Sequence, residues 1–177
     1  ERLLRGARPV TGAIVAVEVS TGNVLVWTEW SSAGLPYGHT LERASAPAAS
    51  VFKLVTAASL LQDAHVQPTL RVCVNGGQHD IGLSQLTRPK TGAALCAPFG
   101  EALGQSRSAV FAQLSHRFLD TARLQAMADR LGFNGPVPFD RTVPMGSVTF
   151  PDDSLQRART AAGLRGSTLS PLGAVYL

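Results

Sequence analysis

The sequence is poor in lysine and contains no long apolar run. Of its 16 basic residues only Lys53 and Lys90 are lysines, and the others are arginines. No stretch reaches the ~18 consecutive apolar residues that a membrane-spanning helix requires, which excludes such a helix from these 177 residues. The chain begins at Glu1 without a methionine or a signal-peptide pattern, and we therefore expect it to be part of a longer protein.

Basic blocks are also absent, although the net charge is +4. The arginines stand singly along the sequence, and only 6% of the residues are aromatic. Nucleic-acid interfaces are typically built from clustered basic residues, so this pattern favours a solvated basic surface and no nucleic-acid partner. Charge alone still allows contact with an anionic polymer such as a cell wall.

Cysteine is scarce, and no metal-binding pattern is present. Cys73 and Cys96 lack the Cys-x-x-Cys spacing, and none of the 4 histidines stands at ligand spacing from another. We therefore expect no metal site and no cofactor. The cysteines are either free thiols or a disulfide that closes a loop of roughly two dozen residues, and the sequence alone leaves both alternatives open.

Hydrophobic periodicity predicts a hairpin followed by a helix. Residues 13–19 and 24–30 are β-branched and partly alternating around a turn at 20–23, which predicts a hairpin over 13–30. Apolar residues then recur at helical spacing over 50–62. The apolar positions of this expected helix are Val51, Leu54, Val55, Ala58 and Leu61.

Residues 99–132 form an expected helical region. A polar break at Gln105–Ser108 separates its first two helices. The third helix has Asp120 or Thr121 as its N-cap and ends at Gly132.

A last helix begins at Ser170 and Pro171, because serine is a good N-cap and proline suits the first helical position. It has few residues left to form, so we expect 1–177 to be a single partial domain. No regular alternation of strands and helices occurs, which argues against a doubly wound nucleotide-binding fold. The remaining segments are expected to be irregular: 31–48, 66–98 (where short strands are allowed) and 133–153.

Ser50 and Lys53 have the spacing of a nucleophile and its base. Side chains three residues apart on a helix are neighbours, so the serine hydroxyl and the lysine amine can reach each other. A serine is a weak nucleophile until a base removes its proton, and an apolar site lowers the pKa of a lysine so that it can be that base. The helix N-terminus also favours a developing negative charge. A purely structural alternative remains, in which Ser50 only caps the helix and Lys53 extends to the solvent.

Successive stretches of the chain resemble the transpeptidase domain of penicillin-binding proteins, in the order of that family. The similarity covers most of the chain, which is more specific than any single motif. The stretches are GAIVAVEVSTGNVLVW, PAASVFKLVTAASLL, EALGQSRSAVFAQLS, LGFNGPVPFD and GSTLSPLGAVYL.

The resemblance assigns roles to four residues. In the Ser-x-x-Lys motif, Ser50 corresponds to the nucleophile and Lys53 to its base. In the Ser-x-Asn motif, Ser106 corresponds to the hydroxyl that relays a proton, and Ser108 stands where the family has the substrate-binding asparagine. A serine is shorter than asparagine and has one donor where the amide has two, which puts catalytic efficiency in doubt.

The third family motif, Lys-Thr-Gly, occurs in this sequence, but not at the position in the chain where the family has it. Lys90-Thr91-Gly92 precedes the second motif and follows Pro89 in an irregular segment, whereas the family places the motif later, on a strand that lines the active site. We therefore expect the genuine motif to follow Leu177 and this chain to hold at most half of the active site.

As implied by the resemblance, the fold is α/β, with a central antiparallel sheet flanked by helices and incomplete in this chain. The implied function is that of a peptidoglycan D,D-transpeptidase, an extracytoplasmic enzyme anchored by a segment outside this chain. Its implied partners are stem peptides ending in D-Ala-D-Ala, β-lactam antibiotics, and other proteins of cell-wall synthesis or division. An oxidising compartment would favour a Cys73–Cys96 disulfide.

Two other functions are compatible with the same motifs. The first is a catalytically impaired module of the same fold with a binding or scaffolding role, which the change to Ser108 would mark. The second is a β-lactamase or β-lactam sensor, which shares the acylation step. Of the three functions considered, the β-lactamase or sensor is the least favoured, because the sequence offers no obvious base for hydrolysis of the ester.

Overall fold

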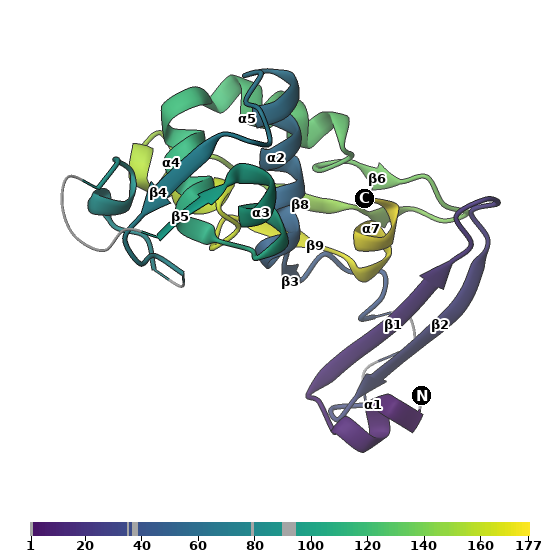
Figure 1. Ribbon diagram of the computed structural model, residues 1–177. Helices are drawn as coiled ribbons and strands as arrows, with labels where there is room; N and C mark the ends of the chain where they lie inside the picture. The colour runs from purple at the N-terminus through teal and green to yellow at the C-terminus, as the bar shows by residue number, and fades with distance from the viewer. Residues whose placement is uncertain (1, 35, 37–38, 79, 90–94) are drawn as a thin grey trace. The chain divides into compact units, whose positions relative to one another are not determined.

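The computed structural model describes the whole chain except residues 1, 35, 37–38, 79 and 90–94 (Figure 1). Its contacts divide the chain into two compact units. The first unit comprises Glu1–Pro47, Gly132–Ser147 and Thr168–Leu177, and the second comprises Ala48–Leu131 and Val148–Ser167. No helix in the described residues is long and apolar enough to cross a membrane.

A long hairpin dominates the first unit. Strands β1 (Thr11–Val17) and β2 (Val24–Ser31) pair antiparallel, from Thr11 opposite Ser31 to Val17 opposite Val24 (Figure 1). The hairpin predicted over 13–30 is therefore confirmed. A short helix that the sequence analysis did not predict, α1 (Arg2–Ala7), precedes it.

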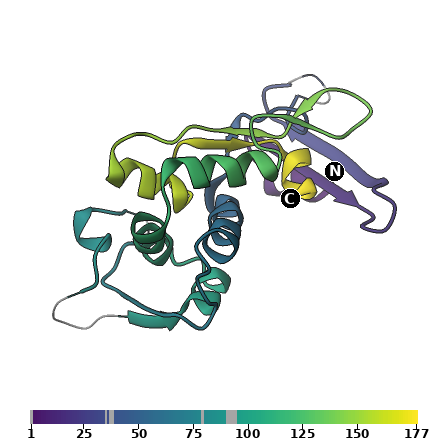
Figure 2. The same cartoon turned by 90° about the horizontal axis from the view of Figure 1, so that it is seen from above.

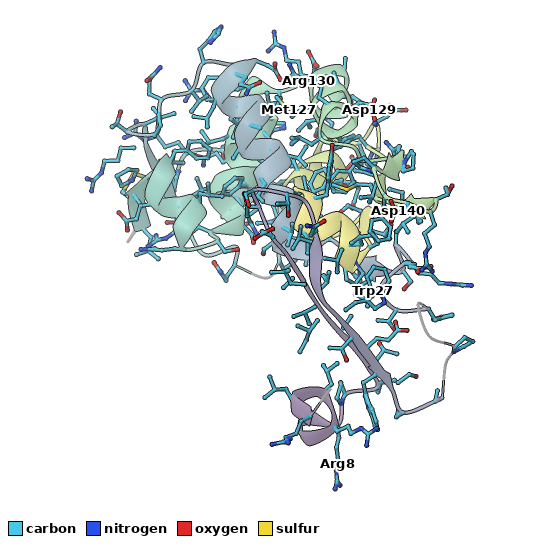
Figure 3. All side chains as sticks on the ribbon, turned by 90° about the vertical axis from the view of Figure 1, so that its right-hand side faces the viewer. Arg8, Trp27, Met127, Asp129, Arg130 and Asp140 are labelled. Atoms are coloured by element: carbon cyan, nitrogen blue, oxygen red, sulfur yellow. A yellow bond between two sulfur atoms is a disulfide. The ribbon has the colours of Figure 1, made fainter. Side chains whose placement is uncertain are left out.

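The rest of the first unit consists of short elements from distant parts of the chain. Trp27 of β2, labelled in Figure 3, stacks on Phe139 with 5.7 Å between ring centroids. The predicted cap of the last helix is present, because Ser170 Oγ accepts a hydrogen bond from Gly173 N at 2.9 Å. The elements, some of which reach the boundary with the second unit, are β3 (Ala46–Pro47), β6 (Pro136–Val137), β7 (Val143–Pro144), β8 (Gly146–Val148), β9 (Ser167–Leu169) and α7 (Pro171–Tyr176).

The second unit is mainly helical and carries the candidate site. Helix α2 packs against α4, α5 and α6 of the same unit, and its blue ribbon lies among these helices in Figure 2. The elements are the 3₁₀ turn η1 (Ala49–Phe52), α2 (Lys53–Gln62), β4 (Arg71–Val74), η2 (Leu83–Gln85), β5 (Leu95–Pro98), α3 (Phe99–Gly104), α4 (Ser108–Phe118), α5 (Thr121–Arg130) and α6 (Ser154–Ala161).

The α/β class with antiparallel pairing is confirmed. In the described residues the strands form small sheets, β1-β2, β3-β9-β8, β4-β5 and β6-β7. The helical break before Ser108 is present as predicted, and the Asp120 side chain caps α5 by accepting from Arg123 N. The segment 133–153, expected to be irregular, contains the short strands β6, β7 and β8 instead.

The expected apolar face of the helix over 50–62 is only partly right. Val51, Leu54 and Leu61 are exposed, whereas Phe52 and Leu60 are fully buried. Neighbouring helices cover the opposite side of α2, where small polar residues are buried. Their burial is tolerated because their hydroxyl groups form hydrogen bonds within the unit. Thr56 Oγ1 donates to Ala161 O at 2.7 Å, and Ser59 Oγ donates to Asp63 Oδ2 at 2.8 Å.

Helix α6 was not predicted from the sequence, although its start carries a recognisable signal. Asp153 Oδ1 accepts a hydrogen bond from Gln156 N at 2.8 Å, the usual geometry of an N-cap. The acidic residue and the glutamine three positions later resemble a capping box. Leu155 is the one large apolar residue of this helix, so the sequence contains too few apolar residues here to predict a helix from their spacing.

The disulfide implied by the family resemblance is present. Cys73 of β4 and Cys96 of β5 lie opposite each other and are bonded. The bond joins two four-residue strands and links residues that are 23 positions apart in the sequence. It therefore adds a covalent constraint to strands whose Val72, Val74 and Ala97 are already buried.

We expect the double substitution Cys73→Ala and Cys96→Ala to lower the free energy of unfolding by about 3 kcal/mol, because it frees a closed loop in the unfolded chain. The sequence separation of 23 residues sets that loop. Urea unfolding followed by circular dichroism measures the change. The same denaturation of the wild type with reductant is the control, and equal midpoints for oxidised and reduced protein would contradict the expectation.

Candidate active site

Ser50 and Lys53 are placed together by the start of α2. Ser50 lies in the 3₁₀ turn η1 and is exposed, whereas Lys53 is the first residue of α2 and its side chain is 1% exposed. Lys53 Nζ donates a hydrogen bond to Ser50 Oγ at 2.8 Å. The predicted neighbourhood of the two side chains is therefore present, and the surface alternative for Lys53 is wrong because the side chain is buried.

Ser106 reaches the same amine from a distant part of the chain. It lies in the break between α3 and α4, and Lys53 Nζ donates to Ser106 Oγ at 3.2 Å. The break itself is fixed by backbone hydrogen bonds, because Ser106 N donates to Leu103 O and Arg107 N donates to Ala102 O, each at 2.9 Å. One lysine amine thus joins two serine hydroxyls.

Burial lowers the pKa of the Lys53 amine from its ordinary value of 10.5, because the charged form loses hydration. The Phe111 ring lies 6.0 Å from Nζ and forms part of the apolar wall. A lysine with a lowered pKa can lose its proton at a pH where an exposed lysine cannot. The site therefore contains a hydroxyl nucleophile beside a potential base.

Two residues of the site have unusual backbone conformations. Ala49, next to the serine, has φ 48°, and Ser106 has φ 54°. Positive φ is uncommon for residues with a Cβ and costs about 1–2 kcal/mol, so such strain persists only where the surroundings impose it. Positive φ occurs at Ala49, next to Ser50, and at Ser106 itself, which indicates that the surrounding structure imposes the backbone conformation at both serines.

The segment after α6 imposes part of that geometry on Ala49. A Cβ built on Gly163 would lie 2.2 Å from Ala49 O, so only a glycine allows this approach. Gly163 also has φ 75°. Sequence reasoning missed this residue, since a glycine between apolar residues carries no sign of the distant backbone that it contacts.

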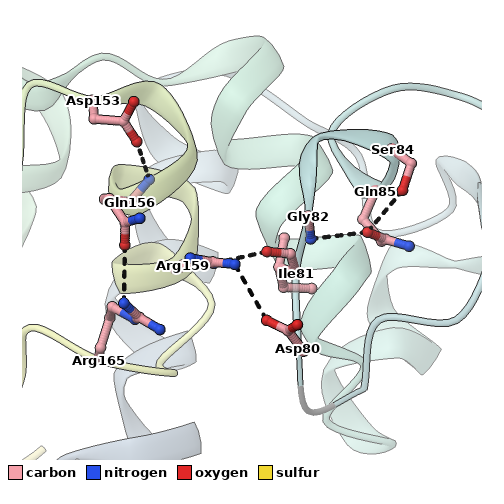
Figure 4. A network of polar contacts seen from close by, with 9 residues as sticks. All are labelled: Asp80, Ile81, Gly82, Ser84, Gln85, Asp153, Gln156, Arg159 and Arg165. Atoms are coloured by element: carbon pink, nitrogen blue, oxygen red, sulfur yellow. Dashed lines mark hydrogen bonds and ion pairs between the residues drawn. The ribbon is translucent and has the colours of Figure 1, made fainter.

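Arg159 anchors α6 to a loop of the same unit (Figure 4). Its Nε donates to Ile81 O at 2.7 Å, and its Nη2 lies 3.2 Å from Asp80 Oδ1. Thr56 ties the other side of α6 to α2 through Ala161 O. These contacts hold Gly163, two residues beyond the end of α6, against the turn that carries the nucleophile.

Ser108 is less directly connected than the other predicted residues. It is the first residue of α4 and is 3% exposed. Within the described part of the chain, the hydrogen bonds of Lys53 Nζ run to Ser50 and Ser106 and none runs to Ser108. Its predicted part in substrate binding stays a prediction. The other match, Lys90-Thr91-Gly92, lies outside the described residues.

Comparison with known structures finds the same fold in penicillin-binding proteins. Penicillin-binding protein A from Mycobacterium tuberculosis matches with a TM-score of 0.69 at 23% identity, over 93% of this chain and 44% of that one. Its penicillin G acyl-enzyme complex matches with a TM-score of 0.66 at 25% identity, over 94% and 44%. A peptidoglycan glycosyltransferase from Burkholderia ambifaria matches with a TM-score of 0.73 at 17% identity, over 98% and 53%. The chain thus spans about half the length of these structures.

A search of curated protein sequences finds no match. In the described residues, no group of three or more histidine, cysteine or acidic side chains is placed to hold a metal ion. The family model of the penicillin binding protein transpeptidase domain matches residues 12–175, nearly the whole chain. The chain therefore belongs to the penicillin-binding protein transpeptidase family.

Proposed function

We propose that this chain belongs to a peptidoglycan D,D-transpeptidase that forms an acyl ester on Ser50. The observation that carries the proposal is the buried Lys53 amine, which has a lowered pKa and lies between the hydroxyls of Ser50 and Ser106. A lone Ser-x-x-Lys spacing is also compatible with a capped helix. A buried amine that contacts both serines is the arrangement that acyl transfer needs.

The proposed reaction begins when neutral Lys53 takes the proton of Ser50 Oγ. The oxygen attacks the carbonyl carbon between the two D-alanines, and a tetrahedral intermediate forms. As this intermediate collapses, the C–N bond breaks and the acyl–oxygen ester remains on Ser50. The leaving amine of D-alanine receives the proton from the Lys53 ammonium through the Ser106 hydroxyl.

The second half of the reaction releases the ester. An amine of another stem peptide attacks the ester carbonyl and loses a proton to the Lys53 amine. The bond between the carbonyl carbon and Ser50 Oγ then breaks, Oγ takes the proton from the Lys53 ammonium, and the cross-linking peptide bond remains. Attack by water in its place gives a free carboxylic acid. Acyl-enzyme complexes of Mycobacterium tuberculosis penicillin-binding protein A with penicillin G and imipenem support acylation by β-lactams as a property to test in this chain.

The proposal includes an extracytoplasmic location. The Cys73–Cys96 disulfide supports it, since such bonds persist mainly in oxidising compartments. Ser108 favours a second candidate, a binding module with impaired catalysis, because a serine replaces the asparagine of the family motif there. A decisive experiment must separate acylation from mere binding.

The test incubates the full-length protein with a fluorescent penicillin and measures the intact mass, followed by proteolysis and mapping of the adduct. We expect a single covalent adduct on the peptide that contains Ser50. An adduct on Ser106 or Ser108 would contradict the assignment of the nucleophile. A folded protein that stays unlabelled would instead support the binding module. Circular dichroism of the same sample checks the fold.

A further inference from the structure

A cavity of about 270 Å³ lies in the second unit beside the Ser106 motif. One side is polar and carries one cation, and the other side is apolar. The polar side chains are Gln78, Gln105 and Arg107, and the apolar ones are Val74, Leu95 and Ala109. Nothing in the proposed acylation chemistry uses this cavity.

The cavity is connected to the candidate active site through the backbone. Arg107 directly follows Ser106, whose hydroxyl contacts the Lys53 amine. Gln78 Nε2 donates to the carbonyl oxygen of Ser106 at 3.4 Å. A group that enters the cavity therefore lies next to Ser106 and Arg107 of the second motif.

The guanidinium group of Arg107 is oriented by its neighbours. Its Nε donates to Gln105 Oε1 at 2.6 Å, and Gln105 Nε2 donates to Glu101 Oε1 at 2.8 Å. Because Glu101 takes the amide N–H of Gln105, the amide oxygen is left to face Arg107. The hydrogen bond to Gln105 uses only Nε of Arg107. In the described residues its two Nη groups are therefore available for bidentate binding of a ligand.

Arg107 also lacks an acidic partner among the described residues. Among the described residues, no carboxylate lies within ion-pair distance of Arg107, and Glu101 is separated from it by Gln105. Arg123, Arg130, Arg141 and Arg159 do have acidic partners in the described residues, so such pairing is possible in this chain but is not made by Arg107. A half-buried arginine that lines a cavity and has no acidic partner in the described residues is suited to bind an anion.

We propose that Arg107 and this cavity bind a carboxylate on an aliphatic side chain of the peptide substrate, away from its D-Ala-D-Ala end. The proposal rests on the proposed function, because it assumes a peptide substrate over Ser50. A single arginine matches a single carboxylate, and the apolar wall of Val74, Leu95 and Ala109 suits the methylene groups that carry it. The cavity thereby selects among stem peptides by charge.

The test uses two peptides that end in D-Ala-D-Ala and differ only in an internal glutamate or glutamine. Their Kd values are measured by calorimetry on the full-length protein with Ser50→Ala, so that no turnover interferes. We expect tighter binding of the glutamate peptide. Arg107→Gln should weaken that binding by about 10- to 100-fold, the effect of losing hydrogen bonds to a charged group, and leave the glutamine peptide nearly unaffected.

Arg117→Gln is the matched control, because it removes the same charge from the far end of α4, where Arg117 packs over Phe118 and does not line the cavity. In this control the ratio of the Kd values of the two peptides should equal the ratio in the Ser50→Ala parent. Equal Kd values for both peptides in the parent protein, or an equal loss for both in Arg107→Gln, would overturn the inference. Failure of the proposed function is read separately, as the absence of a penicillin adduct on Ser50 in the wild type.

Discussion

Replacing Lys53 by methionine should lower the rate constant of acylation at Ser50 by about 1000-fold and leave the protein folded. A general base typically contributes 10²- to 10⁴-fold, and the amine lies 2.8 Å from the serine hydroxyl that it would deprotonate. Methionine has a similar length and no charge, so it fits an apolar site. The rate of fluorescent-penicillin labelling at several concentrations gives the rate constant.

The stability of the Lys53→Met variant should not fall with its activity. Because the pKa of Lys53 in the folded protein lies below 10.5, the unfolded chain binds the proton more tightly. Between the lowered pKa and 10.5 the free energy of unfolding of the wild type therefore rises with pH. Below the lowered pKa, Lys53 is charged in the folded protein, and the burial of that charge lowers the free energy of unfolding by its full amount. Lys53→Met removes this cost, so we expect its unfolding midpoint at pH 7 to equal or exceed that of the wild type.

Lys53→Arg separates the base from the charge. An arginine keeps a cation near Ser50 but does not lose its proton in a protein, so labelling should stay as slow as in Lys53→Met. Recovery of labelling in the arginine variant would show that the lysine acts only as a charge. An acylation rate that is independent of pH in the wild type would contradict a titrating base as well.

The local part of the site could be predicted from the sequence, since it depends on helical spacing. Ser50 and Lys53 are three residues apart, and that spacing alone places their side chains together. Ser106 is 53 positions from Lys53, so no periodicity could bring it to the amine, and only the family resemblance indicated it. The outcome for Ser106 therefore depended on knowledge of other proteins.

Features that depend on packing between distant segments could not be predicted. The exposure of Val51 and Leu54 follows from which helices surround α2, and the apolar pattern does not contain that information. The cavity at Arg107 and the contact of Gly163 with Ala49 have the same origin. The caps of α5 and α7 are local features and could be predicted, whereas the fold class came from the family resemblance and the cap of α6 was missed. The shape around the nucleophile is a tertiary property.

The contact of Gly163 with Ala49 leads to the second large effect. Gly163→Ala should lower the free energy of unfolding by about 2–5 kcal/mol, of which ~1–2 comes from the positive φ and ~1–3 from overpacking. A Cβ 2.2 Å from Ala49 O forces the backbone before the nucleophile to move, because neither partner is a flexible side chain. A displacement of about 1 Å at a reacting group can cost on the order of 100-fold in rate, so we expect labelling of the folded fraction to fall by that factor.

Two other glycines separate the causes. Gly76 has φ 61° and open space around its Cβ position, so Gly76→Ala carries only the backbone strain, about 1–2 kcal/mol. Gly104, at the end of α3, also has open space and no positive φ, so Gly104→Ala should be neutral or stabilising. Urea midpoints and labelling rates are measured for all three variants.

The comparison of rates decides whether Gly163 serves the nucleophile or only the fold. If Gly163→Ala and Gly76→Ala lose stability but label at the same rate when folded, the contact with Ala49 is structural only. If labelling falls in Gly163→Ala alone, the backbone of α6 and the segment after it determine where Ser50 lies. We expect the second result. Ala49 has φ 48° next to the serine, and Gly163 lies so close to the carbonyl oxygen of Ala49 that a Cβ does not fit between them.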